Sequence, residues 1–427
     1  MTTAPSLHDC ERLDTQDPLR SLRDSFDLPP NVIYLDGNSL GVLPRATPDR
    51  IAKAVREEWG RDLITSWNTA GWFHLPQRVG DKIAQLIGAQ PGEVVAADST
   101  SINLFKVLSS ALNIAATDRP ARRKVVSERS NFPTDLYIAE ALCRERGLQL
   151  VLVEAEDLAA SLQEDVAVLM LTHVNYRTGA MHDMADVTAQ AHANGILTVW
   201  DLAHSAGAVP VDLHGADADF GVGCGYKYLN GGPGAPAFVW VHPRHTDRFW
   251  QPLAGWWGHA APFAFTPHYQ PAPGITRYQC GTQPILSLTA LDVGLDTLLA
   301  ADTFGGMPAL RRKSLALTDL FMQLVEARLG SHGLGLATPR VDAQRGSQVS
   351  LTREHGGYAI VQALIARGVI GDFRAGDGHR HPDILRFGFT PLYIGYADVW
   401  HAVDQLHQVL DSGEWQAPRF AAQQAVT

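Results

Sequence analysis

The sequence predicts an α/β protein in which a large domain with a mostly parallel sheet is joined to a smaller α+β domain. Strand-like and helix-like segments alternate through the middle of the chain, as they do when crossover helices join parallel strands. The strand-like segments are nearly continuous apolar runs, which is typical of parallel strands buried on both faces. After about residue 305 the alternation stops, and short strands mix with Gly- and His-rich loops.

The segment before the alternating region begins as a polar arm that closes at Pro29-Pro30. A short extended piece at 32–35 leads into a turn-rich loop at 36–41. Thr47-Pro48 predicts a helix start, with Thr47 as the N-cap and proline at the first helical position. Apolar residues at helical spacing predict helices over 51–59, over 76–89 and after the stretch Asp98-Ser99-Thr100-Ser101.

Two helices are predicted within the alternating region, at 134–146 with Gly147 as its stop signal and at 183–194 with Gly195 beyond its end. Strands are predicted around them at 148–153, 166–172, 196–200, 219–223 and 237–241. Ligands of such sheets bind beyond the carboxyl ends of the strands, so side chains at those ends are candidates for a functional site.

The C-terminal part is predicted to contain a long helix over 309–329 and a final helix near 398–410. We expect it to pack with the N-terminal piece. The predicted division is therefore a large α/β domain at 61–304 and a small domain formed by 1–60 plus 305–427.

The composition limits the partners. Among 427 residues, 35 Lys and Arg stand against 45 Asp and Glu, a net charge of −10, which argues against nucleic acid or an anionic membrane. No run of about 18 apolar residues is present, so no membrane-spanning helix is expected. The N-terminus has no apolar segment behind a basic start, so no signal peptide is expected either.

The cysteines and histidines give no sign of a metal or a disulfide. Cys10, Cys143, Cys224 and Cys280 are scattered without a CxxC pair, which favours reduced thiols in a cytoplasmic protein. The sequence His379-Arg380-His381 is compact, but no HExxH or Cys/His ligand spacing accompanies it. No metal site is therefore predicted.

Asp201 and Lys227 form the most informative pair. Asp201 ends a predicted buried strand, and Lys227 lies in a glycine-dense loop between two predicted strands. A lysine that forms a Schiff base and a carboxylate that keeps a pyridine nitrogen protonated are what pyridoxal phosphate requires. The alternative is an Asp–Lys surface pair beside a structural turn. A dinucleotide site fits poorly, because no GxGxxG follows a strand at the right place.

Nine motifs in fixed order then suggest a family. They are YLDGNSLG (34–41), STSINLFK (99–106), NFPTD (131–135), HVNYRTG (173–179), WDLAHSAG (200–207), GYKYLNGGPG (225–234), WWGH (256–259), GTQPIL (281–286) and RFGFTPLY (386–393). With them the sequence resembles the kynureninases over nearly the whole chain. These belong to the aminotransferase class V group of fold-type I pyridoxal-phosphate enzymes.

The resemblance implies a role for each matching position. Lys227 would be the Schiff-base lysine, Asp201 the partner of the pyridine nitrogen, and Phe132 the residue stacked on the ring. Thr100 and Ser101 would hold the phosphate at a helix start, where free N–H groups favour anions. Further cofactor contacts would come from Asp135, Thr172, His204 and Tyr226, and from Trp256 and Thr282 of a neighbouring subunit, which implies a homodimer. Arg386 would bind the substrate α-carboxylate, with Ser39, Trp67 and Gly281 as further substrate contacts.

The implied reaction is hydrolysis of L-kynurenine to anthranilate and L-alanine, in tryptophan breakdown or pyridine-nucleotide synthesis. Tyr226 is a candidate proton relay or phosphate ligand. The bulk of Trp67 and the missing side chain at Gly281 favour an unhydroxylated ring over 3-hydroxykynurenine, which stays a second candidate. An aminotransferase remains an alternative. A cysteine desulfurase-like lyase is the other alternative. It needs a thiol on a loop well after the lysine, but the last cysteine, Cys280, lies inside a segment matched to cofactor binding, and none follows it. A non-enzymatic sensor would be indicated by loss of the lysine or by an added basic segment, and neither is seen.

Overall fold

The computed structural model describes residues 4–376 and 381–424. They form two compact units. Unit 1 comprises Met1–Arg45, Arg177–Met181 and Asp296–Thr427, and unit 2 comprises Ala46–Tyr176 and His182–Leu295. These borders differ from the predicted division into 61–304 and 1–60 plus 305–427, mainly because residues 46–60 belong to unit 2.

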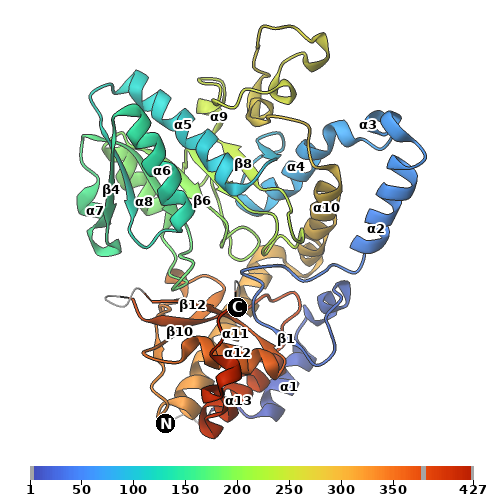
Figure 1. Ribbon diagram of the computed structural model, residues 1–427, viewed down its shortest axis with the longest axis vertical. Helices are drawn as coiled ribbons and strands as arrows, with labels where there is room; N and C mark the ends of the chain where they lie inside the picture. Colours follow the sequence, from blue (N-terminus) through green and yellow to red (C-terminus); the bar gives the residue numbers. More distant parts are fainter. Residues whose placement is uncertain (1–3, 377–380, 425–427) are drawn as a thin grey trace. The chain divides into compact units, whose positions relative to one another are not determined.

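A seven-stranded sheet forms the centre of unit 2 (Figure 1). Its strand order is β2-β8-β7-β6-β5-β3-β4. All neighbouring pairs are parallel except those of β8, which runs antiparallel to both β7 and β2. The prediction of a mostly parallel sheet is confirmed. The strands are β2 (Val94–Ala96), β3 (Lys124–Glu128), β4 (Gln149–Val153), β5 (Val166–Thr172), β6 (Leu197–Asp201), β7 (Phe220–Gly223) and β8 (Phe238–Val241).

Helices cover both faces of this sheet, as the apolar strands require. Successive strand residues point to opposite faces. In β6, Val199 belongs to the core cluster that includes the apolar side of α5 (Thr100–Asp118), whereas the indole N–H of Trp200 lies 3.3 Å from Thr188 of α8 (Met184–Ala193). The other helices of unit 2 are α2 (Thr47–Lys53), α3 (Ser66–Thr69), α4 (Leu75–Ile87), α6 (Pro133–Arg146), α7 (Leu158–Ser161), α9 (Pro243–Thr246) and most of α10 (Ile285–Leu299).

The predicted helix boundaries hold with small shifts. Gly147 ends α6 in a left-handed conformation, with φ of 66°. Asp183 caps α8 by accepting a hydrogen bond from the N–H of Asp186 at 3.1 Å. Thr47 was predicted as an N-cap, and this is wrong: it is the first residue of α2, and the cap position is Ala46, which makes no side-chain hydrogen bond.

Unit 1 is an α+β structure built from both chain ends. Its antiparallel sheet has the order β12-β13-β10-β9, and a separate parallel pair joins β1 to β11. The strands are β1 (Ile33–Tyr34), β9 (Gly335–Leu336), β10 (Gln348–Arg353), β11 (Val369–Ile370), β12 (Asp372–Arg374) and β13 (Asp383–Gly388). The helices are α1 (Leu7–Gln16), α11 (Gly306–Leu329), α12 (Gly357–Ala366) and α13 (Tyr396–Ser412), and α1 packs against α13.

Two expectations from composition concern the whole chain. Within the described residues, no helix combines the length and the apolar character needed to cross a bilayer. All four cysteines are unpaired, and Cys10, Cys143 and Cys224 are buried. The sequence His379-Arg380-His381 was not predicted to bind a metal. Its first two residues, His379 and Arg380, lie outside the described residues.

Candidate functional site

The candidate site of unit 2 begins where two central strands end. Thr172 is the last residue of β5 and Asp201 the last of β6, and the two are register partners. Lys227 follows the carboxyl end of β7, the next strand in the sheet. Because carboxyl ends of parallel strands share one edge, these side chains meet there.

A single pocket collects most of the predicted cofactor residues. Of the predicted residues, it is lined by Thr100, Ser101, Phe132, Asp135, Thr172, Asp201, His204, Tyr226 and Lys227. Three further lining residues, Thr134, Tyr176 and Ala203, were not predicted. Each of them lies inside a motif that the sequence had already marked, so membership of the motif was the available signal.

Lys227 presents a primary amine to this pocket. Its Nζ lies 2.9 Å from Nε2 of the buried His204 and 5.7 Å from the centre of the Tyr226 ring. Burial raises the pKa of Tyr226. The phenol is therefore kept neutral, and it can donate a hydrogen bond rather than carry a charge.

Two buried carboxylates, Asp135 and Asp201, face each other beside this amine. Burial, together with the neighbouring Asp201, raises the pKa of Asp135 well above its usual range. The pKa of Asp201 is also raised, first by burial, although the N–H of Ala203 at 2.8 Å and the charge of Lys227 oppose the rise. Asp135 Oδ2 has no hydrogen-bond partner among the described residues. The pair is short of positive charge, and a protonated ring nitrogen would supply it.

The start of α5 provides the opposite electrostatics. Ser99 caps the helix by accepting from the N–H of Ile102 at 3.4 Å, and Thr100 and Ser101 form the first turn. The N-terminus of this 19-residue helix carries partial positive charge and unpaired N–H groups, and the two hydroxyls add donors. This end of the pocket suits a phosphate.

Asn131 organises the aromatic wall, and it was not predicted. Its side-chain oxygen accepts from the N–H of Phe132 at 2.6 Å and from the hydroxyl of Thr172, while its amide donates to Ser127 at 3.1 Å. Phe132 stands edge-on to Tyr176, with ring centroids 5.2 Å apart, and keeps 43% of its surface exposed. A flat ligand can therefore cover its face.

These features together fit pyridoxal phosphate. The acidic pair fits the pyridine nitrogen, the helix start fits the phosphate, Lys227 fits the aldehyde carbon, and Phe132 fits the ring face.

Four predicted residues of unit 2 do not line this pocket: Trp67, Trp256, Gly281 and Thr282. Trp67 and Trp256 instead both pack on the buried Trp257, with ring centroids 5.0 and 4.5 Å away. Gly281 and Thr282 are exposed. This chain's own pocket therefore lacks them.

The predicted substrate residues of unit 1 form a separate cluster. Arg386 is buried, and it donates from Nε to Asp372 Oδ1 at 2.7 Å and from a terminal nitrogen to Ser39 Oγ at 2.8 Å. Ser39 in turn donates to Asp372 at 2.9 Å. Burial and the Asp372 carboxylate raise the pKa of the nearby Asp36 to about 7. Asp372 and Asp36 were not predicted, although Asp36 lies in the first quoted motif.

Comparisons with known proteins agree with this geometry. A family model described as the kynureninase C-terminal domain matches residues 310–406. The chain is 57% identical to a kynureninase of Burkholderia pseudomallei over 97% of this chain and 98% of that one. It is 56% identical to a kynureninase of Pseudomonas fluorescens over 98% and 99%.

The structural neighbours share the fold at low identity. A cysteine desulfurase of Thermococcus onnurineus NA1, in its apo form, has a TM-score of 0.77 at 19% identity and covers 92% of this chain and 98% of its own. A C-DES mutant with glycine covalently linked to its PLP cofactor has a TM-score of 0.74 at 16% identity, over 90% and 98%. At this identity the likeness concerns the fold.

Proposed function

The chain belongs to the kynureninase family, and from this premise we propose how its residues divide the work of the reaction. The enzyme hydrolyses L-kynurenine to anthranilate and L-alanine with pyridoxal phosphate as cofactor. When bound, the cofactor supplies an electron-withdrawing pyridinium ring that stabilises negative charge at the substrate Cα. The observation that carries the assignment of residues is the meeting of Asp201, Asp135 and Lys227 in one pocket.

Lys227 is the residue that holds the cofactor and then moves the proton at the substrate Cα. A lysine amine can do both, because it is a nucleophile and a base when neutral. His204, 2.9 Å from the amine, orients it through their hydrogen bond. Asp201 holds the ring nitrogen protonated, and Thr100 and Ser101 bind the phosphate. Tyr226, with its raised pKa, donates a hydrogen bond and serves as a phosphate ligand or a proton relay.

Arg386 is our proposed ligand for the substrate α-carboxylate. Asp372 accepts hydrogen bonds from both Nε and a terminal nitrogen of Arg386, which fixes the plane of the guanidinium before substrate arrives. A guanidinium oriented in this way binds a carboxylate through its terminal nitrogens. Ser39 bonds to both members of the pair and completes the arrangement.

We also propose a homodimer in which Trp256 and Thr282 serve the neighbouring subunit's pocket. Support comes from the exposed apolar side chains around this segment: Trp256 is 39%, Phe263 60% and Phe265 78% exposed. A patch of this kind is usually covered by a partner. Mixing two inactive variants, Lys227→Ala and Thr282→Ala, tests this directly. Shared sites predict recovery of activity in the mixed dimer, and no recovery would contradict the arrangement.

Two finer assignments complete the proposal. Unpaired cysteines support a cytoplasmic enzyme, which serves tryptophan breakdown or pyridine-nucleotide synthesis. Trp67 and Gly281, which do not line this chain's own pocket, would reach the substrate ring in the neighbouring subunit together with Trp256 and Thr282. There the bulk of Trp67 and the missing side chain at Gly281 favour the unhydroxylated ring. Comparing kcat/KM for kynurenine and 3-hydroxykynurenine tests the preference, and a tenfold advantage of the hydroxylated substrate would overturn it.

The decisive experiment mixes purified protein, pyridoxal phosphate and kynurenine and follows anthranilate fluorescence and alanine release without a keto-acid acceptor. Release of both products excludes the aminotransferase alternative. Lys227→Ala is expected to lose the cofactor absorbance and turnover together. Full turnover by this variant would overturn the assignment of the lysine.

A further inference from the structure

A cluster of two histidines and one aspartate in unit 1 stands apart from every residue used above. His407 and Asp411 lie one turn apart near the end of α13, at i and i+4, so their side chains share a face. His332 follows α11 and reaches the same point. His332 Nε2 lies 3.2 Å from Asp411 Oδ1, and His407 Nε2 lies 3.2 Å from Oδ2.

The geometry is that of a metal site with one face open. One ligand atom from each residue lies within 4.8 Å of the others. Zinc binds imidazole nitrogen and carboxylate oxygen at about 2.0–2.1 Å, which puts neighbouring tetrahedral ligands about 3.3 Å apart. The two N–O separations of 3.2 Å are close to that spacing. The imidazole rings are nearly perpendicular at 81°, with centroids 5.8 Å apart, so their nitrogens approach from different directions.

The backbone that carries the cluster is held on both sides. The N–H of His332 donates to Leu329 at 3.0 Å, and its carbonyl accepts from Arg353. Arg328, four residues earlier, pairs with Asp404 of α13 and lies 4.8 Å over the ring of Trp400. The end of α11 is therefore already fixed against α13, and little ordering would be needed for a cation to bind.

We propose that His332, His407 and Asp411 bind a divalent transition-metal cation, with Zn²⁺ as the best fit. Two imidazoles and a carboxylate favour zinc and its neighbours over Mg²⁺ or Ca²⁺, which prefer oxygen ligands alone. The side chains are 19%, 33% and 56% exposed, so the cation can enter from solvent and complete its shell with water. Bound metal joins the end of α11 to the last turn of α13 and stabilises unit 1.

The test is zinc binding to the full-length, cofactor-loaded protein, freed of excess pyridoxal phosphate. Equilibrium dialysis is expected to give one zinc per chain with a dissociation constant of about 10 µM or lower. The variants His332→Gln, His407→Gln and Asp411→Asn should each bind no zinc at this site or bind it at least tenfold more weakly than the wild type. His401→Gln, an exposed histidine on the same helix outside the cluster, is the matched control and keeps it.

Thermal unfolding supplies a second readout. Zinc is expected to raise the Tm of the wild type and of His401→Gln by a few degrees and to leave the three cluster variants unchanged. Unaltered zinc binding by the cluster variants would overturn the proposal, because the metal would lie elsewhere. So would a wild type that binds no zinc while His407→Gln lowers its Tm, since the three groups would then be an ion-paired triad only.

Discussion

Asp201 and Asp219 are buried acids on neighbouring strands, and their surroundings differ in almost every respect. Asp201 ends β6 at the carboxyl edge of the sheet, whereas Asp219 immediately precedes β7 at the opposite edge. Each is less than 6% exposed. Burial is therefore comparable, and what differs, besides the edge of the sheet, is the number of donors that meet each carboxylate.

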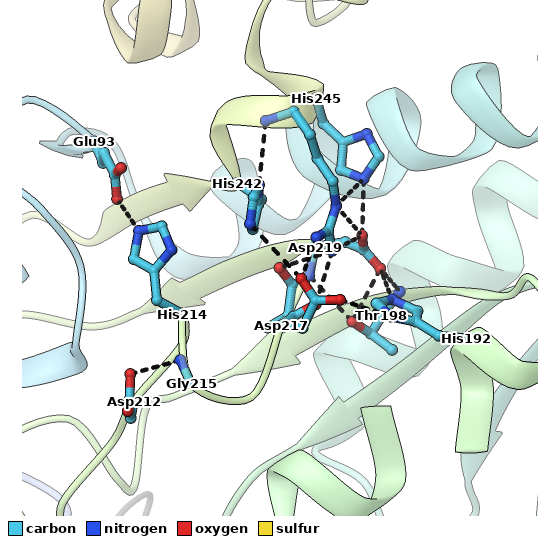
Figure 2. Close-up of polar contacts among 12 residues, drawn as sticks. Glu93, His192, Thr198, Asp212, His214, Gly215, Asp217, Asp219, His242 and His245 are labelled. Carbon is cyan, nitrogen blue, oxygen red and sulfur yellow. Dashed lines mark hydrogen bonds and ion pairs between the residues drawn. The ribbon is translucent and has the colours of Figure 1, made fainter. Parts of the chain in front are cut away.

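Asp219 is fully satisfied (Figure 2). Its Oδ2 accepts from the N–H of Thr198 and from His192, both at 2.8 Å, and its Oδ1 receives Arg244 at 2.6 Å and His245 at 2.8 Å. Burial alone would raise its pKa, but the hydrogen bonds from His192 and His245 and the Arg244 contact outweigh it and hold the pKa far below its usual range.

Asp201, in contrast, faces a second acid and has one N–H donor, from Ala203. Its pKa and that of Asp135 are raised. A satisfied carboxylate fastens strands and helices together, whereas a carboxylate short of cations is a place where a positively charged ligand gains free energy on binding. The difference separates a structural network from a cofactor site.

The variant Asp201→Asn should show the largest effect. An amide cannot hold the pyridine nitrogen protonated, so turnover should fall by about 10³-fold. The apoprotein should keep or raise its Tm, because the change removes one of two repelling acids and leaves an acceptor for Ala203. Anthranilate release and differential scanning calorimetry measure the two effects.

Asp135→Asn is the matched control for this variant. It imitates the protonated member of the pair and leaves Asp201 to serve the ring, so turnover should fall less than tenfold. Equal losses in both variants would show that the two acids are not functionally distinct.

Asp219→Asn should have the opposite effects: it should lower stability and leave turnover nearly unchanged. Removing one charge from a buried, hydrogen-bonded network costs about 3 kcal/mol of unfolding free energy. The folded fraction should keep its kcat/KM within about twofold, since the residue lies at the other edge of the sheet. Asp217 also pairs with Arg244, but its side chain is largely exposed. The variant Asp217→Asn should therefore lower the free energy of unfolding by less than about 1 kcal/mol. Urea unfolding of both variants measures the two losses of unfolding free energy. A large loss in Asp219→Asn with kcat/KM kept would show that the network is structural.

The sequence could predict the first of these regions much better than the second. Nearly continuous apolar runs predicted strands at 166–172 and 196–200 and thereby put Thr172 and Asp201 at strand ends, where the motifs supplied chemistry. Asp219 was predicted merely as the start of a strand. Its donors come from α8, β6 and α9, and only the folded chain brings such separated segments together. The unpredicted Asn131 and Asp372 were missed for the same reason: each acts through side chains fixed by tertiary packing.

Asp372 tests whether a satisfied carboxylate can also serve a binding site. It holds Arg386 and also contacts Arg374 at 2.8 Å, so it resembles Asp219 in its donors. Asp372→Asn should raise KM about 10–100-fold with little change in kcat, because the guanidinium loses its fixed plane. Asp372→Glu should restore part of the affinity. Arg374 contacts the same carboxylate but is partly exposed. The variant Arg374→Gln should therefore keep KM within about threefold of the wild-type value. A fall in kcat alone would argue against a positioning role.

The pH dependence of stability should give the smallest effect. It distinguishes the contribution of His192 from that of Asp219 within one network. The hydrogen bond to Asp219 raises the pKa of His192, so its contribution is complete at pH values below the ordinary histidine pKa and is lost as pH rises through the raised value. The lowered pKa of Asp219 acts oppositely: its contribution is complete above the ordinary aspartate pKa and is lost as pH falls below it. Relative to His192→Asn, the wild type should therefore lose a few degrees of Tm advantage between mildly acidic and alkaline pH. Relative to Asp219→Asn, it should lose its advantage only in acid. An advantage over His192→Asn that grew with rising pH would mean that the imidazole is held neutral, and the network would then owe its stability to Arg244 instead.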